Sequence, residues 1–361
     1  MAVLSTIMKK GEITYGKGTY KYGIAGMPDF PRIPTGIFAV DFCTGGGMPI
    51  YVTSSLYGGP GGGKSTLMYK IIASAQNICW NCYDYLWDCK CGSKKEQKVV
   101  LLPVEQMDTD YTKNMGVNLD NLIVAEPSIG EEGVDIIVEC LRAEDCGLVI
   151  LDSLVGLTPE DELNASASAT HVALQARLLS SLMRKVKSIL VREKKYGHSV
   201  AFMATNQIRS KIGGFGHIKE DVPGGYVSKH DWHMTLRMSQ LKSDKIDKET
   251  ELPLYSKFKA SNVAMANKRK CFMMSGSAEY WLTTSPKAEY KMGTPLDYTV
   301  VLTYLDRAEL LHKSPWFTPL MPEMEFRTKK ELMDSWLEDS VFLTLKRRLI
   351  QHYVAETKNA V

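Results

Sequence analysis

A glycine-rich stretch near residue 60 limits what this chain can fold into more than any other feature. Residues 58–66 read Gly-Gly-Pro-Gly-Gly-Gly-Lys-Ser-Thr and match the pattern G-x-x-x-x-G-K-[ST] in full. Residues 50–57 before it predict a buried strand, and residues 64–76 after it have a helical pattern. A glycine turn at a helix N-terminus surrounds an anion with backbone N–H groups. We therefore predict a phosphate-binding loop; a glycine-rich turn that merely contains Lys-Ser is the alternative.

The pattern also assigns chemistry to individual side chains. Lys64 would contact the β- and γ-phosphates of a nucleoside triphosphate, Ser65 would bind Mg²⁺, and Thr66 would contact the α-phosphate. The predicted nucleotide-binding residues of the loop are Gly58, Gly59, Pro60, Gly61, Gly62, Gly63, Lys64, Ser65 and Thr66. Asp152 ends the apolar residues 147–152, where it would hold the magnesium through water. Alternatively, this aspartate only caps the helix that follows.

Glu105 is a candidate for activating the attacking water. It directly follows the apolar residues 98–104, a predicted strand, so it would emerge at the same sheet edge as the phosphate loop. A carboxylate at that edge could accept the proton of a water molecule. A glutamate in a solvated loop is the alternative.

Strand patterns alternate with helical patterns along the first half of the chain. Further strands are predicted at residues 98–104, 122–125, 148–151 and 200–204, and helices at residues 131–142 and 171–194. This alternation predicts an α/β fold with a doubly wound, mostly parallel sheet. Residues 232–238 and 271–274, with few helices between them, predict an antiparallel extension of that sheet.

The composition divides the chain into three parts. Residues 1–35 contain five glycines and three prolines and predict a short, irregular N-terminal lead-in or oligomerisation segment. Residues 36–285 would form the ATPase core, and residues 286–361 a small C-terminal α/β domain with a helical pattern at 329–354. The 44 basic and 41 acidic residues nearly balance, so overall charge does not indicate a nucleic-acid partner. Because no apolar stretch approaches the ~20 residues of a membrane span and no signal peptide is apparent, we expect a cytoplasmic protein without a membrane partner.

Four of the eight cysteines lie between residues 79 and 91. Cys79 and Cys82 form a C-x-x-C pair and Cys89 and Cys91 a C-x-C pair, within an insertion at residues 78–97. Four thiolates can surround a tetrahedral Zn²⁺, and the expected reducing compartment disfavours disulfides. A structural zinc site is therefore predicted. A reduced cysteine-rich hairpin and redox chemistry are the alternatives.

Several segments, in order, resemble the RecA-type homologous recombinases, including the phage branch typified by UvsX. They are residues 34–49 (PTGIFAVDFCTGGGMP), the phosphate loop, residues 149–159 (VILDSLVGLTP), residues 171–185 (HVALQARLLSSLMRK) and residues 206–213 (NQIRSKIG), followed by Gly224 and Gly225. The similarity covers about residues 33–311, most of the chain. It implies a RecA-like P-loop ATPase core.

The resemblance also implies roles for residues around the nucleotide. It makes Glu105 the general base and Gln207 the sensor of the γ-phosphate, which act with Lys64 in catalysis. Tyr111 resembles the tyrosine that stacks on adenine, and Asp108 resembles the carboxylate that contacts the adenine edge. Tyr111 could equally be a half-buried structural tyrosine.

Two segments are candidates for contacting DNA. Arg177 and Arg184 share one face of the helix predicted at 171–194, away from its apolar stripe. With Ser180 beside them they could bind successive phosphates of a single strand, as the resemblance implies; a solvated charged face is the alternative. The glycine-rich residues 209–225 are expected to lack regular structure alone and to become ordered on a ligand. The predicted contacts there are Arg209, Lys211, Ile212, Gly224 and Gly225.

The function that the resemblance implies is an ATP- and Mg²⁺-dependent recombinase. Such a protein polymerises into a helical homo-oligomer on single-stranded DNA, pairs it with homologous double-stranded DNA in recombination and repair, and hydrolyses ATP to reset the filament. A hexameric helicase-type motor on the same fold is one alternative. A non-catalytic DNA-binding mediator is another, because Ala260 and Asn262 stand where the resemblance places a pair of interface lysines.

Overall fold

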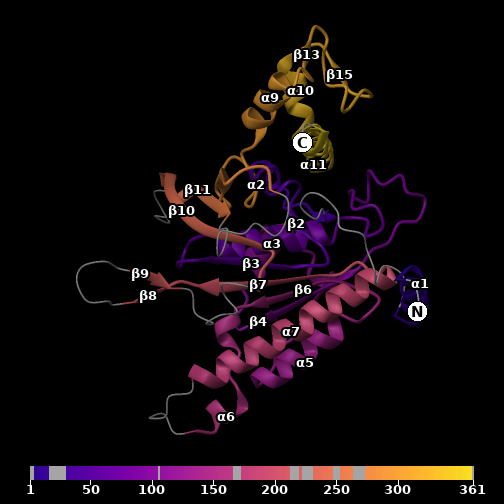
Figure 1. Cartoon of the computed structure of the whole chain (residues 1–361). Coiled ribbons are helices and arrows are strands. Elements are labelled where there is room, and N and C mark those ends of the chain that lie inside the picture. The colour runs from indigo at the N-terminus through magenta and orange to yellow at the C-terminus, as the bar shows by residue number, and fades with distance from the viewer. Residues whose placement is uncertain are drawn as a thin grey trace.

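An eight-stranded sheet runs through the computed structural model, with strand order β12-β11-β10-β3-β7-β6-β4-β5 (Figure 1). The structure describes residues 4–15, 30–104, 106–165, 172–211, 219–221, 231–246, 253–262 and 273–359. The strands of the sheet are β3 (Thr53–Gly58), β4 (Lys98–Pro103), β5 (Leu122–Val124), β6 (Cys146–Asp152), β7 (Ala201–Gln207), β10 (Met234–Ile246), β11 (Pro253–Asn262) and β12 (Ser277–Thr283). None of the described helices is long and apolar enough to cross a membrane.

Most neighbouring strands of this sheet are parallel. From β10 through β3, β7, β6 and β4 to β5, each strand pairs in parallel with the next. β11 and β12 are added beyond β10 in antiparallel orientation. The prediction of a doubly wound, mostly parallel α/β sheet with an antiparallel extension is therefore confirmed.

The position of the antiparallel extension differs from the prediction. Residues 234–238 are the first part of β10, which pairs in parallel with β3 on one side and antiparallel with β11 on the other. Met273 and Met274 form no strand, because the Met274 N–H donates to the Cys43 carbonyl oxygen at 3.0 Å and not to a neighbouring strand. Residues 271 and 272 of that prediction lie outside the described residues. The extension is formed by β11 and β12 instead.

Helices cover both faces of the sheet (Figure 1). The first face packs against α2 (Phe38–Thr44) and α3 (Lys64–Ala75), and the second against α5 (Gly130–Cys140) and α7 (Val172–Tyr196). Two shorter helices, α4 (Thr109–Asn114) and α6 (Glu160–Leu163), lie in the connections. The predicted apolar stripe of α7 is buried at Leu179, Leu182, Met183, Val186, Ile189 and Leu190. This burial confirms which side of α7 faces the sheet.

The N-terminal segment is not the wholly irregular lead-in that we predict from the sequence. Helix α1 (Leu4–Tyr15) forms there, and β1 (Arg32–Ile33) pairs antiparallel with β2 (Met48–Pro49). The prediction is wrong for α1 because Gly11 and several β-branched residues lower the helix propensity of this stretch. The domain boundaries near residues 35 and 285 stay predictions.

The C-terminal elements lie together above the sheet (Figure 1), and their side chains form a second, smaller hydrophobic core. Its elements are α9 (Tyr298–Arg307), the strands β13 (His312–Lys313), β14 (Trp316–Phe317) and β15 (Glu325–Phe326), and the helices α10 (Lys329–Ser335) and α11 (Asp339–Asn359). The helical pattern predicted at 329–354 is thus two helices, separated by the buried Trp336, which stacks on Phe342. Phe38 of α2 packs on Tyr304 and so joins this core to the sheet domain.

Candidate functional site

The phosphate loop connects the end of β3 to the start of α3, as predicted. Gly63, the N-cap of α3, has a φ of 86°, and a Cβ atom there would lie 2.7 Å from Cδ1 of Phe258. Both the left-handed backbone and the close ring therefore require glycine. Gly58 lies so close to the Met238 carbonyl oxygen that a Cβ atom has no room. The loop is a cradle of bare backbone at a helix N-terminus, which fits a bound phosphate.

Lys64, the first residue of α3, lies within this loop. Its Nζ donates hydrogen bonds to the carbonyl oxygens of Gly58 and Gly59 at 3.0 and 2.9 Å. The ammonium group is thus held against the loop backbone, where phosphate oxygens could replace these carbonyls as its partners. Ser65 is exposed and Thr66 is buried at the next two positions of the helix.

The neighbouring strands bring other predicted residues to the same edge of the sheet. In the parallel register, Gly58 lies opposite Gln207, and Pro103 lies opposite Asp152. The Asp152 carboxylate accepts a hydrogen bond from the Thr205 hydroxyl on β7. Asp152 and Gln207 therefore end adjacent strands next to the phosphate loop. This arrangement provides a carboxylate for Mg²⁺ and an amide for a terminal phosphate, although both roles stay predictions.

Tyr111 and Asp108 have protein partners beside the loop. The Tyr111 hydroxyl lies 2.6 Å from Oγ1 of Thr66, and burial raises the pKa of Tyr111. The Asp108 carboxylate accepts the Tyr111 backbone N–H at 2.9 Å and so caps α4. These contacts fix both residues near α3, and their contact with adenine stays a prediction. Glu105 lies outside the described residues, directly after Val104.

Two residues that surround the loop are not predicted by the sequence pattern. Phe258 of β11 packs against Gly63, and Oε1 of Gln240 lies 3.8 Å from the position that a Gly61 Cβ atom would take. Gln240 of β10 lies opposite Phe258 of β11, and the pairing of β10 with β3 brings both to the loop. The alternation of polar and apolar residues in β11 is the signal that could have marked Phe258 as facing the core.

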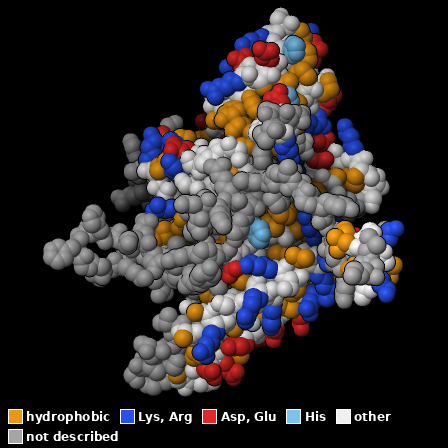
Figure 2. Space-filling view, viewed as in Figure 1, with side chains coloured by type: hydrophobic (Ala, Val, Ile, Leu, Met, Phe, Trp, Pro, Cys, Tyr) orange, Lys and Arg blue, Asp and Glu red, His pale blue; other side chains and the backbone are white. Residues whose placement is uncertain are grey.

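The face of α7 at which DNA contacts are predicted is open to solvent. Arg177 and Arg184 are both exposed, and basic side chains gather along this helix (Figure 2). The Ser180 hydroxyl donates to the Ala176 carbonyl oxygen of its own helix at 2.7 Å. Exposure leaves both guanidinium groups accessible to a phosphate, but contact with DNA stays a prediction.

The described residues of the segment 209–225 form a short β-ladder, so for these residues the expectation that they lack regular structure alone is wrong. β8 (Arg209–Lys211) pairs antiparallel with β9 (Lys219–Asp221). Backbone hydrogen bonds between the two strands offset the entropy lost by ordering the chain. The predicted contacts Ile212, Gly224 and Gly225 lie outside the described residues.

The four cysteines of the insertion form one cluster. Their Sγ atoms all lie within 4.8 Å of one another, with Cys79–Cys91 at 3.7 Å, Cys82–Cys89 at 3.5 Å and Cys89–Cys91 at 3.3 Å. Sulfurs bound to Zn²⁺ at ~2.3 Å are about 3.8 Å apart in a tetrahedron, so the cluster has the dimensions of such a site. Although burial opposes ionisation, backbone N–H donors such as Lys95 lower the pKa of Cys79 to about 6. Burial raises the pKa of Cys82 in the same cluster to about 12, so the spacing of the four sulfurs, and not their ionisation, supports the metal site.

The fold and the loop together define a class of protein. A strand, a G-x-x-x-x-G-K-[ST] loop and a helix lie beside a parallel strand that ends in aspartate, on a doubly wound sheet. This arrangement is that of a P-loop nucleotide-binding protein.

Known proteins narrow this class to a family. The family model of the RecA N-terminal domain matches residues 2–269. The chain is 31% identical to the RecA protein of Acholeplasma laidlawii over 252 residues, which are 69% of each chain. It is 30% identical to the RecA protein of Sulfurovum sp. (strain NBC37-1) over 319 residues, 87% of this chain and 82% of the relative. The chain belongs to the RecA family, and its place in the phage branch stays a prediction.

Gly63→Ala is expected to weaken ATP binding about tenfold or more, because the left-handed backbone and the Phe258 ring both resist a methyl group. Gly197→Ala is the matched control: Gly197 also has a positive φ, 79°, but nothing lies within 4 Å of its Cβ position. It should therefore show the backbone strain without a change in ATP affinity. Calorimetric titration with a non-hydrolysable ATP analogue measures both variants. An ATP affinity of Gly63→Ala equal to that of Gly197→Ala would contradict the predicted role of the loop.

Proposed function

We propose that this protein is an ATP-dependent DNA recombinase that polymerises on single-stranded DNA and catalyses homologous pairing and strand exchange. One observation carries the proposal. Gln207 lies opposite Gly58 of the phosphate loop, and two residues later the chain enters β8, the start of the predicted DNA segment 209–225. A change of contact at the γ-phosphate would therefore reach the DNA segment through a short, continuous stretch of backbone. Membership of the RecA family supports this reading.

Each site residue would have its own role in the hydrolysis of ATP. Lys64 would contact the β- and γ-phosphates, while Ser65 and Asp152 would hold Mg²⁺, which supplies charge stabilisation to the transferred phosphoryl group. Glu105 would accept a proton from the water that attacks the γ-phosphorus, and ADP would leave as the bond to its β-phosphate oxygen breaks. Gln207 would lose its phosphate contact, which would return the DNA segment to its weakly binding state.

Filament formation would use the N-terminal helix. Leu4, Ile7 and Ile13 of α1 are 68%, 45% and 86% exposed. At about 100° per residue, Leu4 and Ile7 share one face of α1, and exposed apolar side chains on one face are typical of a surface that another protein covers. We propose that a second copy of this chain covers them, so that successive subunits are linked along the DNA.

The second candidate is a non-catalytic DNA-binding mediator. The side chains of strand β11, where the resemblance implies interface lysines, favour this candidate. Ala260, at a position where the resemblance implies an interface lysine, is fully buried in the core. Nζ atoms of Lys257 and Lys259 on the same strand lie 2.6 and 3.5 Å from the carboxylate of Glu279. ATP turnover on saturating single-stranded DNA distinguishes the two candidates, because a mediator would bind DNA with negligible turnover.

Lys64→Ala should abolish ATP-dependent filaments on single-stranded DNA, because the loop loses the ammonium group that contacts the phosphates. Lys113→Ala, which changes an exposed lysine of α4, should form filaments as the wild type does. Electron microscopy with a non-hydrolysable ATP analogue measures both. Filaments of normal length from Lys64→Ala would sink the proposal, and closed rings from the wild type would favour a hexameric motor.

Arg184→Ala should weaken binding to single-stranded DNA several-fold and reduce the slope of log affinity against log salt by about 0.7, since one phosphate contact is lost. Arg142→Ala is the control. Arg142 is exposed and lies near the start of β6, at the sheet edge opposite to the phosphate loop, so its loss should change neither the DNA affinity nor the salt slope. Fluorescence anisotropy at several salt concentrations measures both variants. The same slope in Arg184→Ala and in the wild type would show that this face does not bind DNA.

Zn²⁺ is the metal that we propose for the cysteine cluster. Tetrahedral sulfur ligation suits zinc or iron, and zinc is the usual ion where four cysteines in short spacings hold a structural site. Cys79 is buried and Cys91 is exposed, so the cluster lies between the protein interior and solvent. An ion could therefore enter from the solvent side.

The purified protein should contain about one zinc ion per chain by mass spectrometry of the metal content. Cys91→Ser should lose most of this zinc, because the site then has three sulfur ligands. Cys140→Ser changes a cysteine outside the cluster and should retain it. A coloured protein with iron in place of zinc would show that the metal assignment is wrong.

A further inference from the structure

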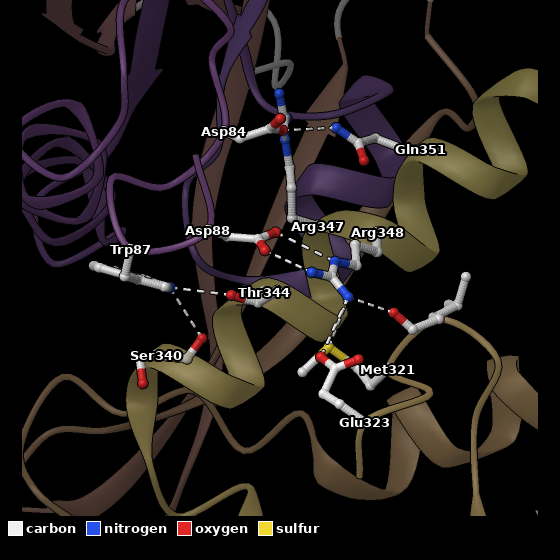
Figure 3. Close-up of polar contacts among 11 residues, drawn as sticks. Asp84, Trp87, Asp88, Met321, Glu323, Ser340, Thr344, Arg347, Arg348 and Gln351 are labelled. Carbon is white, nitrogen blue, oxygen red and sulfur yellow. Dashed lines mark hydrogen bonds and ion pairs between the residues drawn. The ribbon is translucent and has the colours of Figure 1, made fainter. Parts of the chain in front are cut away.

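The segment between the two cysteine pairs contacts the C-terminal domain (Figure 3). Residues 83–88 lie between Cys82 and Cys89, and several of their polar groups meet α11. The residues in these contacts are Asp84, Trp87 and Asp88 of the insertion and Ser340, Thr344, Arg347, Arg348 and Gln351 of α11. A metal bound to all four sulfurs would close this contact segment into a loop.

The ion pair of Asp88 with Arg348 anchors the contact. The carboxylate accepts Nη2 at 2.5 Å and Nε at 3.2 Å, which is a bidentate geometry. Only 22% of the Arg348 side chain and 21% of the Asp88 side chain are exposed, so solvent and salt screen the pair weakly. Nη1 of Arg348 also donates to the Leu320 carbonyl oxygen at 2.6 Å, which holds the guanidinium within the C-terminal domain.

Trp87 adds a second contact. Its Nε1 donates to the Ser340 carbonyl oxygen at 3.2 Å and to the Thr344 hydroxyl at 3.0 Å. Its ring stacks on Tyr85, with the ring centroids 4.7 Å apart and the planes 4° from parallel. Because Tyr85 is buried in the core of the sheet domain, this stack connects α11 to that core.

The backbone of the insertion has little regular structure of its own to hold this contact segment. Residues 78–97, all of which the structure describes, contain one isolated β-bridge, Ile78 with Tyr85, and no helix or longer strand. After Trp87 the chain reaches the sulfur cluster near the protein surface, where the second cysteine pair meets the first. A cross-link at that point would remove conformational entropy from the undocked segment and so favour docking.

We infer that the cysteine cluster is a metal site whose role is to dock the C-terminal domain, with Zn²⁺ holding residues 83–88 in the conformation that binds α11. This inference rests on the proposed zinc site. Loss of the metal would weaken the contacts of residues 83–88 with α11, while the contact of Phe38 with Tyr304 and the hydrogen bond of Lys346 to Gly36 would keep the domain attached to the sheet. The effect would therefore be local, with the strands of the large sheet unchanged.

Hydrogen–deuterium exchange of the full chain tests the docking role. Zinc-loaded protein is compared with protein treated with 1,10-phenanthroline and with Cys91→Ser. In both metal-free samples, the amides of residues 340–351 should exchange about tenfold faster, because the helix opens more often without its contacts. The amides of β6 and β7 should keep their rates, which excludes global unfolding as the cause.

Arg348→Gln separates docking from metal binding. This variant should retain its zinc and still show faster exchange at residues 340–351, because the bidentate contact with Asp88 is lost. Arg327→Gln, which changes an exposed arginine of the same domain, should match the wild type in zinc content and in exchange.

Each remaining outcome has a distinct meaning. Unchanged exchange at residues 340–351 after zinc removal would overturn the docking role and leave the zinc site standing. A wild-type protein without bound metal would overturn both the zinc site and its docking role. The recombinase proposal is independent of these results, because electron microscopy of Lys64→Ala on single-stranded DNA tests it separately.

Discussion

The nucleotide site depends on the parallel register of four adjacent strands. β3, β7, β6 and β4 lie side by side, and their register places Gly58 opposite Gln207 and Pro103 opposite Asp152. Because side chains alternate between the two faces of a strand, a slip of one residue would turn an aligned group to the wrong face. Helices bury apolar side chains on both faces of these strands, so such a slip would expose part of each core.

The phosphate loop, the central strands and α7 can be predicted from the sequence because their signals are local. Buried parallel strands are continuous apolar runs, and the apolar stripe of α7 has the helical period. Features that depend on distant partners are not predicted: α1 has a weak pattern around Gly11, and Phe258 reaches the loop through the pairing of β10 with β3. The β8–β9 ladder is missed for the same reason, since its glycine-rich connection resembles an unstructured loop.

The C-terminal domain is joined to the sheet domain by contacts of different kinds. Phe38 supplies an apolar contact with Tyr304, while Nζ of Lys346 donates to the Gly36 carbonyl oxygen at 2.6 Å and to the Asp297 carboxylate at 3.3 Å. Lys346 and Asp297 are almost fully buried, so removing either partner would leave an unpaired buried charge. The contacts of the cysteine-rich insertion lie on both sides of Lys346 along α11, from Ser340 to Gln351. Their ion pair of Asp88 with Arg348 is less buried than that of Lys346 with Asp297, so it responds more readily to a local change.

Helix α3 connects the phosphate loop to the cysteine-rich insertion. It begins at Lys64 in the phosphate loop and ends at Ala75, whose carbonyl oxygen accepts Nε1 of Trp80 at 3.1 Å. Trp80 is buried between the first two cysteines of the insertion. The 12 residues of α3 span about 18 Å as a stiff helix. The phosphate loop and the cysteine-rich insertion are thus at opposite ends of one stiff helix, and a rigid shift of α3 along its axis would move both.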